Sequence, residues 1–229
     1  DSTITNNSGG IIRSGTGDAI SGEQDSGDVT SGNTITNSGT IFSDDQRAIN
    51  FFSDASTTTV TNNSSGHIYN SNTNETIKLD TSSTLTNSGK IENKNSSDNN
   101  SVLLVGDNNT VTLKDSGLVI GTIATSSGTS GNKLKIQHGV GQSYYYKTSG
   151  DFDLEDLDGN QIVKGSAGSV GQGASETIDE LLSYKSINLR NFVKRYKNSD
   201  FEDKKEGWGE GFASYLNRDG NNQNLALEY

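Results

Sequence analysis

The sequence contains no cysteine, no proline and no methionine among its 229 residues. Without cysteine the chain can form neither a disulfide framework nor a thiolate metal site. The absence of proline suits a chain whose backbone N–H groups are nearly all needed in β-sheet hydrogen bonds. The two histidines, His67 and His138, are too few to provide a zinc site. We therefore expect no bound metal and no cofactor.

Apolar residues and positive charge are scarce as well. The chain is 28% hydrophobic and 7% aromatic, with a mean hydropathy of -0.68, which argues against one round hydrophobic core. The net charge of -11 argues against nucleic acid or an anionic membrane surface as a partner. Such a composition is compatible with disorder, but the few apolar residues recur at matched positions, which favours a folded repeat.

A short motif built around Asn, Ser and Gly occurs five times in the first half of the chain. The copies read TITNNSGGII, TITNSGTIFS, TVTNNSSGHIYN, TLTNSGKIEN and TVTLKDSGLVIG. Their first apolar residues are separated by 31, 25, 25 and 26 residues and are Ile4, Ile35, Val60, Leu85 and Val111. A period of this length is typical of a solenoid, in which each unit buries its apolar side against the next.

Each repeat divides into three short stretches of strand character. The first has the form Thr-apolar-Thr and contains the five residues above, which we expect to stack in one core column. The second contains Ile11, Ile41, Ile68, Ile91 and Val119. The third contains the pairs Ile49 and Phe51, Ile77 and Leu79, Val102 and Leu104, and Leu134 and Ile136. Three strands in about 25 residues predict an all-β, right-handed parallel β-helix over residues 1–139, with coils stacked roughly 4.8 Å apart.

An asparagine follows the first strand in four of the five repeats, at Asn6, Asn37, Asn62 and Asn87. The Ser and Gly residues that come next tolerate left-handed backbone and favour turns. Equivalent asparagines on stacked coils can form a ladder of amide hydrogen bonds. We favour this structural turn ladder over N-glycosylation at Asn6, Asn62 and Asn95, which also fit the Asn-x-Ser pattern.

The period is lost after residue 139. Residues 140–165 predict a hairpin-like closing cap, and residues 166–174 form a Gly/Ser linker. Four acids in the cap could suggest calcium, but their order does not match an EF-hand loop, so we assign them to turns. These acids are Asp151, Asp153, Asp156 and Asp158.

The last part of the chain changes first to helical and then to strand periodicity. Residues 175–198 predict an amphipathic α-helix, whose apolar stripe contains Ile178, Leu181, Leu182, Leu189, Phe192 and Val193. Residues 207–229 include WGEGFASYLNRDG. There, aromatic and small residues alternate as in the first strands of a transmembrane β-barrel, which would be incomplete in this chain. The aromatic residues at this barrel start are Trp208, Phe212 and Tyr215.

The order of these pieces resembles a type V autotransporter of Gram-negative bacteria around its passenger-to-barrel junction. The resemblance lies in the Asn-Ser-Gly coils, the acidic closure, the Gly/Ser linker, the basic-ended helix and WGEGFASYLNRDG, and it covers the whole chain. It implies a fragment of a cell-surface protein whose β-helix passenger is exported and displayed at the outer membrane for adhesion or aggregation. The implied partners are the outer membrane through the missing barrel, the barrel-assembly machinery, and host-cell or glycan surfaces.

The resemblance also implies two further properties. Residues 102–163 correspond to the region that often promotes folding of the remaining passenger. Some members cut themselves at an Asn-Asn pair in the linker helix, whereas here Asn188 and Asn191 stand apart, which argues against that route.

An enzymatic alternative rests on Asp54, Asp80 and Asp107, which recur just after the third strand. Glycan-degrading β-helices need an acid and a base at a fixed separation, or a calcium ion beside a basic residue. The other members of such a site are missing, so we expect no catalytic residue and assign the aspartates to turns. The alternative functions are a polysaccharide-degrading β-helix enzyme and a glycan-binding protein of the phage-tailspike type.

Overall fold

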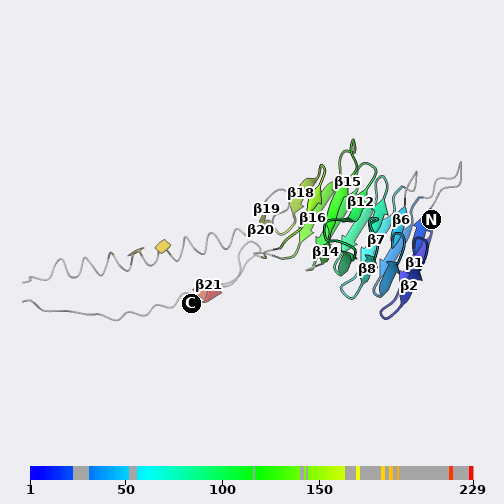
Figure 1. The fold of residues 1–229 in the computed structure, drawn as a ribbon. Helices are drawn as coiled ribbons and strands as arrows, with labels where there is room; N and C mark the ends of the chain where they lie inside the picture. The colour runs from blue at the N-terminus through cyan, green and yellow to red at the C-terminus, as the bar shows by residue number, and fades with distance from the viewer. Residues whose placement is uncertain are drawn as a thin grey trace, which may run out of the picture.

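A computed structural model describes residues 1–22, 31–51, 56–115, 117–139, 142 and 144–162. It also describes residues 169–170, 182–183, 186–187, 190, 217–218 and 227–228. The strands form a parallel β-solenoid of about five coils, so the predicted all-β solenoid is confirmed. Figure 1 shows the strands stacked along one axis, from blue β1 at the N-terminal end to yellow-green β18 at the other.

Three parallel sheets line the core of the solenoid, and each of the first five coils contributes one strand to each sheet. Sheet A contains β1 (Thr3–Asn6), β4 (Thr34–Asn37), β7 (Thr59–Asn62), β10 (Thr84–Asn87), β13 (Thr110–Lys114), β16 (Lys133–Gln137) and β18 (Asp153–Asp156). Sheet B contains β2 (Ile11–Ser14), β5 (Thr40–Ser43), β8 (His67–Asn70), β11 (Lys90–Asn93) and β14 (Leu118–Ile120). Sheet C contains β3 (Ile20–Gly22), β6 (Ile49–Phe51), β9 (Ile77–Leu79), β12 (Asn100–Leu104), β15 (Thr122–Thr125) and β17 (Thr148–Ser149).

The predicted core stack forms one continuous column on the inner side of sheet A. Its partners follow in register, one per coil: Ile4, Ile35, Val60, Leu85 and Val111, followed by Leu134 and Leu154. Residues 35, 60, 85 and 111 have no exposed surface, whereas Ile4 in the first coil is only partly buried. Because strand side chains alternate with a period of two, the threonines that flank each of these residues point outward.

The inner column of sheet B corrects one predicted residue. The register pairs Ile12 with Ile41, and Ile11 is 70% exposed on the outer face. The inward residue of sheet B follows the inward residue of sheet A by six positions in the coils whose turn reads Asn-Ser-Gly. In the coils with longer turns, it follows by eight positions. An offset of seven would place Ile11 on the wrong face, because a shift of one residue reverses the direction of a strand side chain.

The fifth coil corrects another prediction. Leu134 and Ile136 are buried as expected, but they belong to β16 in sheet A and begin a sixth coil. The third strand of the fifth coil is β15, where Ile123 pairs with Val102. Only Gly121 separates β14 from β15, so this coil makes its corner without the loop found in earlier coils. A prediction that assumes equal spacing between strands therefore misses β15.

Residues 144–162 continue the stack beyond β16. β17 pairs with β15 in sheet C, and β18 pairs with β16 in sheet A, both in parallel. β19 (Gln161–Ile162) then pairs antiparallel with β20 (Ser169–Val170). Sheet B, by contrast, has no strand after β14 among the described residues.

The C-terminal predictions fall mostly outside the described residues. Within predicted helix 175–198, the described residues Leu182, Ser183, Ser186, Ile187 and Arg190 are helical. The rest of the apolar stripe, namely Ile178, Leu181, Leu189, Phe192 and Val193, is outside the described residues, as are Trp208, Phe212 and Tyr215. In the region of the predicted barrel start, β21 (Asn217–Arg218) pairs antiparallel with β22 (Leu227–Glu228). The linker helix and the barrel therefore stay predictions.

Candidate functional site

The corner between sheets A and B carries a ladder of buried asparagine side chains. Asn6 Nδ2 donates to Asn37 Oδ1, Asn37 Nδ2 donates to Asn62 Oδ1, and Asn62 Nδ2 donates to Asn87 Oδ1, each at 2.8 Å. The four side chains are at most 6% exposed. In the fifth coil Leu113 takes the equivalent position, and Asn87 Nδ2 donates instead to the Leu118 carbonyl at 3.2 Å. The ladder therefore has a structural role along four coils.

In three of the coils the motif glycine has a different role from the predicted one, whereas Gly9 in the first coil has a positive φ of 78° as predicted. Gly39, Gly66 and Gly89 do not have positive φ angles in the structure. A Cβ atom on Gly66 would clash with the Asn62 amide and the Asn37 carbonyl, and one on Gly89 would clash with the Gly66 carbonyl. At Gly39, Gly66 and Gly89, glycine is required because the backbones of neighbouring coils approach closely, and left-handed backbone is not the reason.

A second buried polar column precedes the strands of sheet A and was missed in the sequence. The Ser83 N–H donates to Asn109 Oδ1 at 2.8 Å, and the Asn109 N–H donates to Asn132 Oδ1 at 3.0 Å. The column contains Asn33, Thr58, Ser83, Asn109 and Asn132, all buried. Each member comes directly before the first residue of a sheet A strand, and this shared position is the signal that could have revealed it.

The aspartates considered for catalysis act as turn residues. Asp80 Oδ1 accepts hydrogen bonds from the Thr81 N–H at 2.7 Å and from the Thr81 hydroxyl at 3.1 Å. Asp107 Oδ1 accepts one from the Ser130 N–H at 2.7 Å. Asp54 lies outside the described residues. Within the described ranges, no group of three or more His, Asp or Glu side chains is arranged to hold a metal ion.

The outer face of sheet B carries a stack of two aromatic rings between two cations. The Phe42 and Tyr69 rings are parallel within 10° and their centroids are 4.7 Å apart. The Arg13 guanidinium lies 5.3 Å from the Phe42 centroid, and Lys94 Nζ lies 3.3 Å from the Tyr69 centroid. Arg13 also pairs with Asp44 at 2.6 Å. Such cation–π contacts stabilise the arrangement, and they also cover the outer ring faces.

Charged side chains extend this surface next to Tyr69. Glu92 Oε2 accepts hydrogen bonds from Lys90 Nζ at 2.7 Å and pairs with His67 Nε2 at 3.1 Å. Burial lowers the pKa of His67, although the hydrogen bond with Glu92 opposes this change. Burial would raise the pKa of Glu92, but the bonds from Lys90 and His67 outweigh it, so the pKa lies below its ordinary value. The charged groups of this face are therefore paired with one another.

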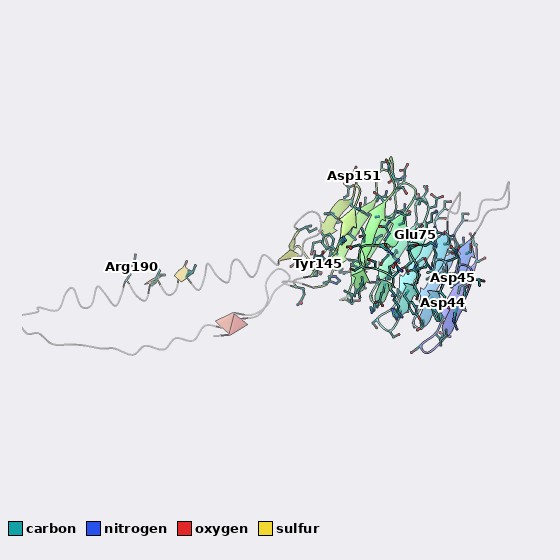
Figure 2. The ribbon with its side chains drawn as sticks, in the orientation of Figure 1. Asp44, Asp45, Glu75, Tyr145, Asp151 and Arg190 are labelled. Atoms are coloured by element: carbon teal, nitrogen blue, oxygen red, sulfur yellow. The ribbon has the colours of Figure 1, made fainter. Side chains whose placement is uncertain are left out.

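A pocket of about 510 Å³ lies where sheet B ends below β14. Its walls include Asp98, Leu118, His138, Tyr144, Tyr145 and Lys147. Tyr145 is 69% exposed and Leu118 is 47% exposed. Figure 2 shows Tyr145 at the β18 end of the stack, opposite the end that holds Asp44. We had assigned this segment only to a closing cap; the consecutive tyrosines 144–146 are the sequence signal for the pocket.

Several contacts hold the pocket walls in place. The Tyr144 hydroxyl donates to Asp156 Oδ2 at 2.9 Å, and its ring meets the His138 ring edge-on at 5.0 Å between centroids. Lys147 Nζ pairs with Asp98 Oδ1 at 2.8 Å at the rim. Burial lowers the pKa of His138, and the nearby carboxylates oppose this change only in part, so the neutral imidazole is favoured.

Comparison with protein-family models, with curated proteins and with solved structures finds no match to this chain. In the part of the chain that the structure describes, no helix combines the length and the apolar character needed to cross a membrane. The functional argument therefore rests on the solenoid and its surfaces.

Proposed function

We propose that this chain is part of an autotransporter whose β-helix passenger is displayed at the cell surface and acts by adhesion or aggregation. The observation that carries the proposal is that polar columns and apolar side chains fill the interior of a continuous solenoid. Its interior is occupied by buried columns such as Ile35, Val60 and Leu85. Only the outer faces and the ends of such a stack are available to a partner, as in other solenoids that bind through extended surfaces.

The chemistry of the surface favours binding over turnover. Glycan hydrolysis needs two carboxyl groups that face the same bond at a defined separation. Asp80 and Asp107 accept hydrogen bonds from turns on successive coils, which holds them in structural roles. The charges beside Tyr69 are likewise paired with one another. These contacts support an adhesive rather than a catalytic passenger.

Surface display can be tested with an epitope tag between Ser64 and Ser65, two exposed residues in the turn between β7 and β8. The gene for the whole protein is expressed in a Gram-negative host, with a tagged periplasmic protein as the control. We expect antibody to label the tagged solenoid on intact cells as strongly as on permeabilised cells. Labelling that appears only after permeabilisation would contradict surface display.

Adhesion and turnover can be separated in the same cells. We expect cells that display the protein to settle or attach faster than cells without it, and to release no reducing ends from polysaccharides. If the native chain releases reducing ends and the Asp80→Asn variant does not, the adhesive function is contradicted. The enzymatic alternative is then supported.

A further inference from the structure

The pocket lies beside β14, the last sheet B strand among the residues that the structure describes. In the described part of the chain, sheet A continues through β16 and β18 and sheet C continues through β17, whereas sheet B has no strand after β14. The described residues between β16 and β17 cross the open face without pairing with β14. A cavity of about 510 Å³ remains at this level. Its volume lies within the range of small-molecule sites and has room for roughly one or two sugar rings.

The walls of the pocket combine an aromatic ring with hydrogen-bonding groups. Tyr145 is 69% exposed, so a large part of its ring is available to a ligand. Gln142 and His138 lie in the same wall, and Asp98 lies at the rim. A pyranose ring has an apolar C–H face that packs on an aromatic ring and hydroxyl groups that need donors and acceptors around it. An aromatic surface surrounded by amide, imidazole and carboxylate groups matches both requirements.

The charges around the pocket select among sugars. Asp115, Asp156 and Asp158 act on His138 through their negative charge. Lys147, a basic side chain among the described residues that line the pocket, is paired with Asp98, so this pair adds no net charge at the rim. A carboxylate on the ligand would be repelled in such surroundings. Uronic acids and sialic acids are therefore disfavoured relative to neutral sugars.

The other aromatic pair on the surface lacks this capacity. Phe42 and Tyr69 stack on each other, and Arg13 and Lys94 cover their remaining faces. A sugar ring could not pack on either ring without displacing a cation. The pocket at the end of sheet B is therefore the better place for a glycan.

We propose that the pocket formed by Tyr145, Gln142, His138 and Asp98 binds a neutral hexose or N-acetylhexosamine unit of a glycan. The biological role of this binding rests on the proposed adhesive function. The binding itself belongs to the folded chain and can be measured without cells.

The test uses the purified 229-residue chain and three neutral disaccharides, namely maltose, lactose and diacetylchitobiose, in ligand-detected NMR. Glucuronic acid and N-acetylneuraminic acid are the charged comparison probes. We expect saturation transfer to at least one neutral disaccharide at millimolar concentration, and a clearly weaker signal from both acids. Absence of transfer to every neutral probe, in a sample whose circular dichroism shows the folded solenoid, would overturn the proposal.

A matched pair of variants locates the binding. Tyr145→Ala removes a mostly exposed ring and should weaken binding at least about tenfold without changing the thermal unfolding curve. Phe42→Ala removes a ring outside the pocket and should leave the affinity unchanged. Equal affinity of the two variants, or stronger binding of the acids than of the neutral sugars, would refute the pocket assignment.

The same variants separate this inference from the proposed function. Equal adhesion of cells that carry the native chain and cells that carry Tyr145→Ala would support the adhesive function. It would also show that the pocket is not the site of adhesion. If the purified chain binds sugar but intact cells do not expose the solenoid, the proposed sugar site is supported. The proposed surface display is then refuted.

Discussion

Replacing Asn62 by alanine should destabilise the solenoid because Asn62 lies in the middle of the buried ladder. Its amide nitrogen donates to Asn87 Oδ1 at 2.8 Å and to the carbonyls of Gly66 and Lys90 at 3.2 Å. Its oxygen accepts from Asn37 Nδ2 at 2.8 Å. The side chain has no exposed surface, so water cannot replace these partners without rearrangement.

The expected magnitude follows from the partners that would be left unsatisfied. Asn62→Ala removes the donor for Asn87 Oδ1 and the acceptor for Asn37 Nδ2. Each buried polar group left without its partner costs about 1 to 3 kcal/mol, so the free energy of unfolding should fall by about 2 to 6 kcal/mol. The neighbouring Asn63, whose Nδ2 donates to Ser38 Oγ at 2.8 Å at a partly buried site, is the matched control. Asn63→Ala should cost only about 1 kcal/mol.

Urea unfolding followed by circular dichroism compares the two variants, and amide hydrogen exchange shows where the structure opens. Solenoids can unfold in parts, so loss of protection in β7 and β10 is the more local signal. Asn62→Ala should lower the unfolding midpoint well below that of Asn63→Ala and open these strands first. Equal midpoints and equal protection would refute the structural role of the ladder.

Three further variants test the core, the corner and the pH response. Val60→Asp should cost more than about 3 kcal/mol because it buries an unpaired charge, whereas Thr61→Asp on the outer side should cost little in the same thermal melt. Gly66→Ala should cost about 1 to 3 kcal/mol through its clash with the adjacent coil, whereas Gly15→Ala meets nothing within 4 Å and should be nearly neutral in urea unfolding. Burial lowers the folded-state pKa of His138 below its ordinary 6.5, so its contribution is complete above about pH 6.5 and is lost as the pH falls through the folded-state pKa. On acidification, the free energy of unfolding of the native chain should therefore fall relative to that of His138→Gln. A difference that does not depend on pH would contradict this.

The repeat period was sufficient to predict the solenoid. The 25-residue spacing of Ile35, Val60 and Leu85 placed them one above another, and the register pairs them in that way. The recurring asparagines could also be placed on one corner, because identical positions in stacked coils must occupy the same place. Both predictions depend on residue positions that recur at the same place in successive coils.

The sequence was less informative where coils differ in length. The longer turn before Ile12 shifts the inward position by two residues, and only the pairing with Ile41 reveals this. The short corner at Gly121 places β15 directly after β14, so Ile123 was overlooked in favour of Leu134. Turn length varies freely at the surface, whereas the strand register is fixed by the core.

The pocket could not be predicted from the repeat because it arises where the repeat stops. The consecutive tyrosines 144–146 indicate a change in the surface, but they do not show that β14 is the last strand of sheet B in the described part of the chain. Tyr146 is buried at 2% exposure and Tyr145 is exposed at 69%. Their opposite environments depend on the path of the chain across the open face.

The in-register stacking of successive coils is the central structural claim, and cysteine cross-linking tests it directly. The chain has no cysteine, and Thr36 and Thr61 are paired neighbours on the outer side of β4 and β7, with Thr86 one coil further on β10. Neighbouring strands are about 4.8 Å apart, so a Thr36→Cys and Thr61→Cys pair should be bridged by dibromobimane, which fluoresces when it links two nearby thiols. A Thr36→Cys and Thr86→Cys pair, about 10 Å apart, should not be bridged. Efficient bridging of the second pair, or failure of the first, would contradict the 25-residue register.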